Sequence, residues 1–290
     1  MKPSASRRAV GAMVLACLLW GGTFVAIRDS VAAIPPALLV ASRFLCAGLI
    51  FAAILIARRR VPSTADLRGG AASGLLMVGG FVLQAEGLRT TSAGSSAFLT
   101  CAGTLLTAFW AWLLLRQRPG ARLLAGIAIA LAGSALLSLD AGLRLGRGEL
   151  LTLAGAALFA LQIVAVSRWV SVADPVALVC VQSFVAAAIL APFVGPPAVL
   201  FAALFAAPTS ATLWNFVYLA IAGSTIAPLL QVLAQRTLPA GRIGLLFALE
   251  PVFALVFALT LGAESFAMRW WLGAGLILAA VLLVESRAEA

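Results

Sequence analysis

Glu250 is the residue of this sequence that is the best candidate for a chemical role. Its carboxyl group lies in the middle of a long apolar segment, directly before Pro251. A charged side chain inside a bilayer is costly and is usually functional or paired. Desolvation favours the protonated acid, so Glu250 is a candidate to carry a proton. Alternatively, it bridges to a neighbouring helix, and Pro251 only supplies a bend with free carbonyls. The sequence leaves both interpretations open.

Two further charges fall inside apolar segments. Arg43 lies early in one segment, and Glu86 lies late in the next. Antiparallel neighbours would bring them to a similar level, where they could pair. We therefore expect both to be structural intramembrane charges.

Uncharged polar side chains also recur within apolar segments. Ser96, Thr100, Gly103 and Thr107 follow one another at spacings of four, three and four, which places them on one face of a helix. Such a face lines a pathway, or its hydroxyl groups bond to carbonyls of their own helix. Both alternatives remain open.

Three glutamines and two aromatic residues extend this pattern. The amides of Gln84, Gln162 and Gln231 suit an amino or carboxylate group on a bound molecule, or form hydrogen bonds between helices. Trp20 and Phe159 are placed near the middle of their segments by a rise of about 1.5 Å per residue. They are candidate apolar walls of a cavity, or ordinary packing aromatics.

Composition limits the classes of protein that this chain can represent. It has 290 residues, of which 63% are hydrophobic and 10% are charged, and it has no histidine. This predicts a polytopic membrane protein with a bilayer as its surroundings. The net charge of +10 comes from short arginine clusters between apolar runs, so we expect no nucleic-acid partner. Without histidine, and with four cysteines at spacings unlike a metal motif, we expect no metal and no cofactor.

Ten apolar segments set the predicted architecture, because each approaches the roughly 20 residues that span a bilayer. The unbroken runs favour helices over barrel strands. Arginine clusters such as 58–60 predict that both termini face the cytoplasm. Residues 194–210 leave room for an interfacial piece. The ten segments run over about 9–27, 35–57, 67–87, 93–115, 121–139, 149–168, 174–193, 211–231, 240–261 and 269–286.

The chain also contains an internal repeat. The pattern of Gln, Arg, Thr, Ala, Gly and Leu over residues 84–99 recurs without a gap over residues 231–246. The repeat predicts two units of five spans, residues 1–142 and 143–290. Because five is an odd number, the second unit enters the membrane from the opposite side, which gives an all-α fold with inverted topology. Such a plan is common among secondary transporters, whose binding sites lie between the repeats.

Five short motifs carry a resemblance to a known family. They are Trp20-Gly21-Gly22-Thr23-Phe24, Ser42-Arg43-Phe44, Arg89-Thr90-Thr91-Ser92-Ala93-Gly94, Leu249-Glu250-Pro251-Val252-Phe253 and Gly262-Ala263-Glu264. In this order, the chain resembles the EamA-type family of the drug/metabolite transporter superfamily, and within it the bacterial aromatic amino-acid and paraquat exporter branch. The first half has Gly103-Thr104 where the second has Glu250-Pro251, so no Glu role is carried into the first half.

The resemblance implies a ten-helix carrier whose cavity is lined mainly by helices 1, 3, 4, 6, 8 and 9. It implies export of small metabolites, amino acids including aromatic ones, by alternating access, with multidrug or organic-cation efflux as the alternative. We expect a monomer in the bacterial inner membrane. The candidate substrate-binding residues on these helices are Trp20, Thr23, Met77, Gly80, Gln84, Ser96, Leu99, Thr100, Phe159, Gln162, Tyr218 and Phe247.

Other classes of function fit the sequence less well. An enzyme or intramembrane protease needs a nucleophile with a base, or metal ligands, and the apolar segments contain no histidine and no paired aspartates. A channel usually shows rings of charge or a repeated carbonyl filter, and none is visible. No Walker A motif is present, so transport has to follow a substrate gradient or ion exchange.

Overall fold

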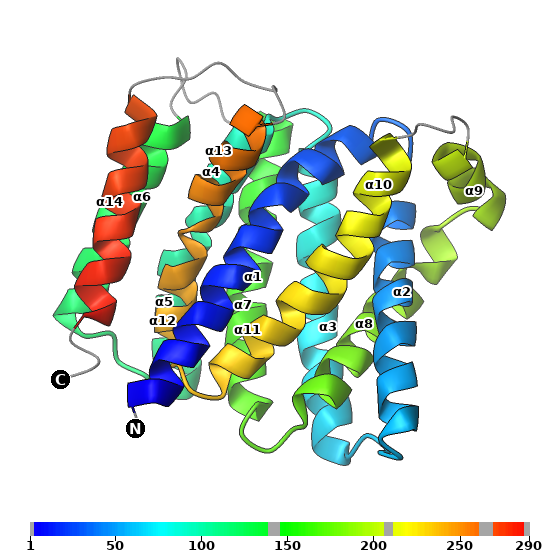
Figure 1. Cartoon of the computed structure of the whole chain (residues 1–290), viewed down its shortest axis with the longest axis horizontal. Coiled ribbons are helices and arrows are strands. Elements are labelled where there is room, and N and C mark those ends of the chain that lie inside the picture. The colour runs from blue at the N-terminus through cyan, green and yellow to red at the C-terminus, as the bar shows by residue number, and fades with distance from the viewer. Residues whose placement is uncertain (1–2, 139–145, 206–210, 261–268, 287–290) are drawn as a thin grey trace.

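The computed structural model describes residues 3–138, 146–205, 211–260 and 269–286, and within these ranges the regular structure is entirely helical (Figure 1). The predicted boundary at 142/143 and the Gly262-Ala263-Glu264 motif lie outside them. The elements are α1 (Pro3–Ser30), α2 (Pro36–Ala57), α3 (Thr64–Gly87), α4 (Ala93–Cys101), α5 (Gly103–Leu115), α6 (Ala121–Ser138), α7 (Arg147–Trp169), α8 (Pro175–Leu190), η1 (Ala191–Phe193), α9 (Pro197–Phe205), α10 (Ala211–Tyr218), η2 (Leu219–Ile226), α11 (Ala227–Gln235), α12 (Ala240–Phe247), α13 (Glu250–Thr260) and α14 (Arg269–Glu285).

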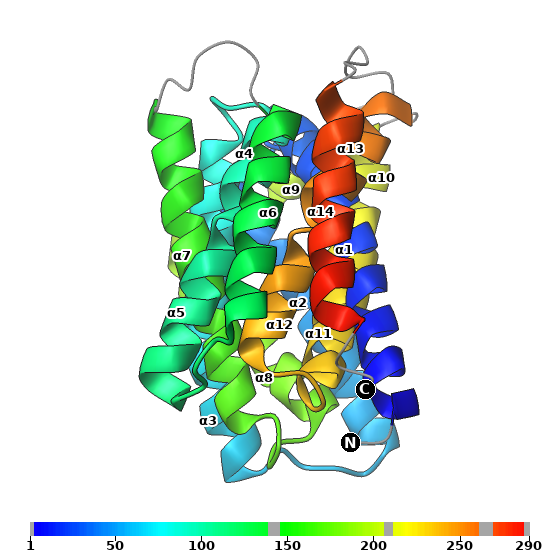
Figure 2. The same cartoon turned by 90° about the vertical axis from the view of Figure 1, so that its left-hand side faces the viewer.

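The long helices form one bundle, and their axes lie roughly parallel to one another (Figures 1 and 2). α1 begins and α14 ends at the same end of the bundle. The connections α2–α3, α5–α6, α7–α8 and α11–α12 lie at that end too. These are the loops that we expect to face the cytoplasm. An orientation with both termini in the cytoplasm requires these four loops, the start of α1 and the end of α14 to lie at one end of the bundle, as they do (Figures 1 and 2). Which side of the membrane this end faces stays a prediction.

Seven helical stretches in the described ranges are long and apolar enough to cross a membrane, by length and composition. They are Ala5–Ser30, Pro36–Ala57, Ala93–Leu115, Arg147–Trp169, Pro175–Phe193, Ala211–Gln235 and Ala240–Phe257. The chain is therefore a multi-pass membrane protein. Outside this set, α14 has 17 residues, and α6 contributes a shorter apolar stretch, Ala121–Leu136. The count of ten spans stays a prediction.

Two of the predicted segments are each divided into two helices. α4 ends at Cys101 before α5 begins at Gly103, and α12 ends at Phe247 before α13 begins at Glu250. At both junctions backbone N–H groups bond three residues back, from Ala102 to Leu99 and from Leu249 to Leu246, which tightens the turn. The two breaks occupy matching positions in the internal repeat. Pro251, which lacks an N–H group, adds a local reason for the second break.

A third segment, the predicted 211–231 helix, contains a stretch of π-helix. η2 joins α10 to α11, and the hydroxyl group of Thr225 donates to the carbonyl of Ala220, 2.8 Å away and five residues earlier. Pro228 follows within the first turn of α11. π-Helical turns and proline both interrupt regular helix geometry. Gly223 and Pro228 together mark this segment in the sequence as a helix that can break, and the irregular stretch η2 lies there.

Packing contacts recur between the two halves. α3 packs on α7 and α8, while α11 packs on α1 and η2 packs on α2; α5 packs on α7, while α13 packs on α1. The pairs α2–α8 and α6–α14 join equivalent helices across the halves, and the contact of α5 with α12 matches that of α13 with α4. Two halves related by a twofold axis would produce this pattern.

Small residues allow several of these helix pairs to approach closely. A Cβ atom at Gly70 would lie 2.6 Å from Val181 Cβ on α8, and one at Gly126 would lie 2.7 Å from Val284 Cγ2 on α14. Both residues begin patterns of two small residues four positions apart, Gly70 with Gly74 and Gly126 with Ala130, and such patterns predict close helix contacts. Gly275 with Ala279 forms the same pattern and predicts a third close contact, but this prediction is wrong, because a Cβ added at Gly275 would meet nothing within 4 Å.

Gly133 and Gly275 give a matched pair of glycine substitutions. A methyl group at Gly133 would lie 2.6 Å from the carbonyl oxygen of Gly273, so Gly133→Ala is expected to destabilise the α6–α14 contact by about 1–3 kcal/mol. Gly275→Ala is expected to leave stability unchanged or raise it by up to about 1 kcal/mol, since alanine favours helix. Thermal midpoints in detergent measure both. Equal shifts for the two variants would contradict the packing described here.

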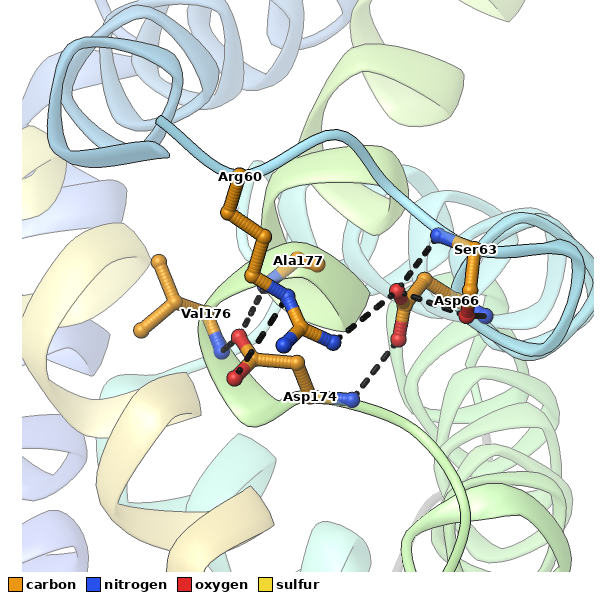
Figure 3. Close-up of polar contacts among 6 residues, drawn as sticks. All are labelled: Arg60, Ser63, Asp66, Asp174, Val176 and Ala177. Atoms are coloured by element: carbon orange, nitrogen blue, oxygen red, sulfur yellow. Dashed lines mark hydrogen bonds and ion pairs between the residues drawn. The ribbon is translucent and has the colours of Figure 1, made fainter. Parts of the chain in front are cut away.

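A polar cluster joins the α2–α3 and α7–α8 loops (Figure 3). The fully buried Asp66 carboxylate accepts hydrogen bonds from the backbone N–H and hydroxyl groups of Ser63, at 2.7 and 2.8 Å, and from the backbone N–H of Asp174 at 2.7 Å. Asp174 in turn caps α8 by accepting from the N–H groups of Val176 and Ala177, both at 3.0 Å. Arg60 lies 3.7 Å from Asp66 and 3.8 Å from Asp174. The cluster ties one half of the chain to the other.

This cluster predicts acid-sensitive stability. Burial raises the pKa of Asp66, but the hydrogen bonds from Ser63 and Asp174 and the charge of Arg60 outweigh burial and hold that pKa below its ordinary value. A carboxyl group with a lowered pKa in the folded state stabilises the fold above its ordinary pKa of about 3.9, and this contribution is lost as the pH falls through the folded value.

We therefore expect Asp66→Asn to lower the thermal midpoint at pH 7 and to flatten its decline between pH 6 and pH 3. The expected cost at neutral pH is about 1.5–3 kcal/mol, typical of hydrogen bonds to a charged group. Asp29→Asn is the control, because Asp29 is 48% exposed and contacts only its neighbour Arg28 in the described contacts. An Asp66→Asn variant that melts in parallel with the wild type across this range would refute the assignment.

Candidate functional site

A cavity lies between the two halves, near the middle of the bundle. Its volume is about 60 Å³, room for several water molecules at about 10–15 Å³ each. Helices of both halves supply its wall, including the broken α4–α5 and α12–α13 pairs. The lining residues are Trp20, Thr23, Phe24, Met77, Phe81, Gln84, Thr100, Gly103, Thr104, Thr107, Ala156, Phe159, Ala160, Gln162, Ile163, Gln182, Pro228, Gln231, Gly244, Phe247 and Glu250.

Two pairs of aromatic rings form apolar parts of this wall. Trp20 stacks on Phe247 with ring centroids 5.2 Å apart, and its indole N–H donates to the carbonyl of Gly223 at 3.0 Å. Phe159 meets Phe81 edge-on, with centroids 4.8 Å apart. Trp20 and Phe159 therefore both line the cavity, each held by a partner ring.

The absence of a side chain at Gly80 allows Phe159 to lie against α3. A Cβ atom at Gly80 would be 2.5 Å from Phe159 Cε1. Gly80 is not on the cavity surface, although we expected it to contact substrate. Its position in the structure is behind a wall residue.

The glutamines line the cavity and also connect helices. Gln231 donates to the side-chain oxygens of Gln162 at 3.1 Å and Gln235 at 2.9 Å, which joins α11 to α7. Gln84 on α3 donates to the Thr100 hydroxyl on α4 at 3.3 Å. The hydrogen bonds between helices that the sequence allowed are therefore present, and the same amides border the cavity, while their binding of a substrate group stays a prediction.

The polar face of the predicted fourth span is divided between the cavity and the packing behind it. Thr100, Gly103 and Thr107 line the cavity, and the two threonines donate to carbonyls of their own helical segment, Ser96 and Gly103, each at 2.8 Å. Ser96 is buried behind the wall, 3.5 Å from the Thr152 hydroxyl. Thr104 Oγ1, on the cavity, has no hydrogen-bond partner among the described residues.

Two more candidates lie off the cavity surface. Leu99 is buried in helix packing. Tyr218 directs its hydroxyl group to the carbonyl of Leu19, 2.6 Å away, beside Gly22. Thr23, Met77 and Phe247 line the cavity as expected of their helices.

Phe24, Phe81, Ala160 and Gln182 line the cavity although sequence reasoning did not select them. Gln182 could have been found, since it is a lone amide in an apolar segment, as Gln84 is. It donates to Met77 Sδ at 2.6 Å and accepts from the Ser73 hydroxyl at 3.2 Å. The apolar residues give no comparable signal, because nearly every position in such segments is apolar.

Glu250 is the only ionisable residue of the described chain that lines the cavity. It begins α13, is 5% exposed, and forms no hydrogen bond or ion pair with other described residues. The bridge to a neighbouring helix that the sequence allowed is therefore not seen among them. What remains is a carboxyl group that faces the cavity and is available to a proton or a cation.

The expected pair of Arg43 and Glu86 does not form. Glu86 lies in the last turn of α3, where its side chain is 37% exposed and pairs with Arg89 at 3.3 Å, so the expectation that it pairs with Arg43 is wrong. Arg89 lies three residues after Glu86, so the two side chains are neighbours at the end of α3, and this proximity explains why Glu86 pairs with Arg89 and not with Arg43.

Arg43 is instead fully buried among aromatic rings. Its guanidinium carbon lies 4.4 Å from the ring centroid of Phe81 and 4.9 Å from that of Phe44. None of its three side-chain nitrogens has a hydrogen-bond partner in the described part of the chain. Cation–π contacts of about 2 kcal/mol do not offset a desolvation penalty of several kcal/mol for a buried ion.

Comparison with known proteins gives matches along nearly the whole chain. The model of the EamA-like transporter family matches twice, over residues 7–139 and 146–286. An "Uncharacterized transporter" of Archaeoglobus fulgidus is 28% identical over 275 residues, covering 95% of this chain and 85% of that protein. The "Uncharacterized inner membrane transporter YedA" of Escherichia coli K12 is 29% identical over 282 residues, covering 94% and 89%.

A solved crystal structure has a similar fold. Its TM-score is 0.73 at 21% sequence identity, and the match covers 97% of this chain and 95% of that chain. The similarity applies to the fold alone.

Proposed function

Because the chain belongs to the EamA-like transporter family, we propose that it is a secondary transporter that exports small amphipathic metabolites, foremost amino acids including aromatic ones. The observation that carries this proposal is the cavity between the halves. It combines apolar ring pairs, Trp20 with Phe247 and Phe81 with Phe159, with amide groups and one carboxyl group. Apolar walls with a few placed polar groups suit a small molecule with an apolar body and a polar end.

Alternating access through ten spans in two inverted halves is the proposed mechanism. The recurring helix pairs and the matching breaks at α4–α5 and α12–α13 support it. In carriers of this plan, discontinuous helices border a central site, and the halves rock against each other around it. Pro228, at the cavity wall, and η2, which precedes it, give the eighth span a place to bend. We propose a monomer in the bacterial inner membrane.

Glu250 is the proposed coupling group. A lone carboxyl group in a membrane cavity is costly as a bare anion, so it is neutralised by a proton or by a cationic group. Exchange of one for the other would couple export of an amino compound to proton entry.

Organic-cation efflux is the second candidate, and one observation favours it. Among the described residues that line the cavity, the single ionisable group is acidic, so a cation finds a partner and a free anion does not. A permanently cationic substrate such as tetraphenylphosphonium distinguishes this candidate from an amino-acid carrier.

Counterflow in proteoliposomes tests the proposal. Vesicles loaded with unlabelled L-phenylalanine are expected to accumulate labelled L-phenylalanine transiently, with saturable initial rates, whereas protein-free vesicles are not. Accumulation of labelled tetraphenylphosphonium alone would replace the first candidate by the second. Non-saturable equilibration without counterflow would indicate a channel and would refute both.

A further inference from the structure

Arg43 is a buried charge that the proposed function does not yet use. An amino acid carries a carboxylate, and the cavity lining in the described chain offers no cation to receive it. Arg43 is 0% exposed, its guanidinium group remains charged at any physiological pH, and its three side-chain nitrogens lack partners among the described residues. Five N–H donors in a planar fork match a carboxylate.

We propose that Arg43 is the anion subsite of this carrier and binds the carboxylate of the transported molecule. The inference rests on the proposed function, because it names the charged group by which an amino-acid substrate is recognised.

Phe81 contacts both Arg43 and the cavity. Its ring contacts the guanidinium group, and the same residue lines the cavity and packs edge-on against Phe159. An aromatic ring on an sp³ carbon moves between staggered positions by rotation about one bond. We infer that rotation of Phe81 connects Arg43 to the cavity.

The placement of α2 agrees with a site that opens in another conformation. α2 lies on the side of the bundle away from α6 and α14, and it packs against α8 and η2 (Figure 1). η2 is the irregular stretch that precedes Pro228 on the cavity wall. Movement of η2 relative to α2 would change the packing of the helix that carries Arg43, so that anion binding and the conformational change would be linked.

A structural role for Arg43 makes a different prediction. A charge held only by Phe44 and Phe81 would stabilise or destabilise the fold without regard to the substrate. A subsite instead discriminates between substrates that carry a carboxylate and those that lack it. The ratio of the KM values for a substrate with a carboxylate and for one without it therefore distinguishes a binding role of Arg43 from a structural one.

The experiment compares L-phenylalanine with L-phenylalaninamide, which keeps the ammonium group and ring but lacks the carboxylate. Initial counterflow rates give KM for each in the wild type, Arg43→Gln, Arg43→Lys and Phe81→Leu. Arg43→Gln is expected to raise KM for L-phenylalanine at least tenfold and to change KM for the amide less than twofold. Arg43→Lys is expected to show a smaller change in the same direction, because an ammonium group cannot bind a carboxylate through two parallel hydrogen bonds. Arg28→Gln is the matched control, since Arg28 is partly exposed and pairs with Asp29.

Equal changes in KM for the two substrates in Arg43→Gln would overturn the proposal. If Arg43→Gln does not fold, the same comparison is made in Arg43→Lys, and equal changes there would overturn it. A dependence on chloride shared by both substrates and lost in Arg43→Gln would mean that an inorganic anion occupies the site, and would also overturn it. Phe81→Leu is expected to lower KM for L-phenylalanine relative to KM for the amide, because a smaller side chain covers Arg43 less. An unchanged ratio of the two KM values would show that Phe81 does not control access to Arg43.

Ligand-induced shifts of the thermal midpoint are measured alongside transport. If the wild type shows no counterflow, the proposed function fails, while a shift by L-phenylalanine that exceeds that by the amide and disappears in Arg43→Gln still supports the subsite. If neither compound shifts the midpoint, the subsite fails with it.

Discussion

Replacing Glu250 with glutamine is expected to abolish the response of transport to a pH gradient. Glutamine keeps the shape and polarity of the side chain but cannot exchange a proton. Because Glu250 is the ionisable residue on the described cavity wall and has no partner there, the other described wall residues offer no substitute. The variant also loses the charged hydrogen bond that Glu250 would form with the cationic group of the substrate, at a cost of about 1.5–3 kcal/mol, so the transport rate itself should fall roughly 10- to 100-fold.

Proteoliposomes with and without an inward-directed proton gradient supply the measurement. Glu250→Asp is expected to retain part of the response, because it keeps the ionisable group at a shorter reach. Glu86→Gln is the control, since Glu86 is partly exposed and pairs with Arg89 at the end of α3. A normal gradient response in Glu250→Gln would sink the coupling role, whatever the absolute rate.

Replacing Ala160 with phenylalanine is expected to block transport while the protein remains folded. Ala160 is 1% exposed and lines the cavity, so the added ring would enter a space of about 60 Å³. Overpacking of this kind costs about 1–3 kcal/mol, and a penalty felt by the substrate-bound state would reduce transport roughly 10- to 100-fold. The measurement is L-phenylalanine counterflow together with the thermal midpoint and a monodisperse elution profile.

Ala53→Phe is the matched control, because Ala53 on α2 is exposed on the surface of the bundle. It introduces the same ring at a position that does not line the cavity. Near-normal transport by Ala160→Phe would show that the substrate does not pass through this cavity. Equal loss of transport in both variants would attribute the effect to the fold and not to the cavity.

Several features of the fold follow from the sequence alone. Segment length and apolar composition predict a helical multi-pass membrane protein, since a bilayer core leaves helices as the way to satisfy backbone groups in unbroken apolar runs. Gly223 and Pro228 predict an interruption in the helical segment 211–231, and η2 occupies that position. The repeated pattern at 84–99 and 231–246 flanks two helices that break at matching positions. These features are local, so they do not depend on how the helices rotate.

The composition of the cavity wall was decided by tertiary packing. A membrane helix is apolar on nearly all sides, so the sequence carries little information on which face points inward. Tyr218 was expected on the wall but bonds to Leu19, whereas Phe81 and Gln182 were not expected there and are present. In the same way, Gly133 lies at a close helix contact, and Gly275 faces open space.

The charges show the same division. The sequence places Glu250 and Arg43 inside apolar segments. The free-energy cost of a charge inside a bilayer is enough to predict that both residues have a functional or structural role. Only the structure shows that Glu86 turns to Arg89, that Arg43 is left among aromatic rings, and that Glu250 faces the cavity. Helix depth is set by the position of a residue along its segment, which the sequence determines. The partner of a charge depends on helix rotation and side-chain direction, which only the packing of α1, α3, α7 and α12 around a common cavity decides.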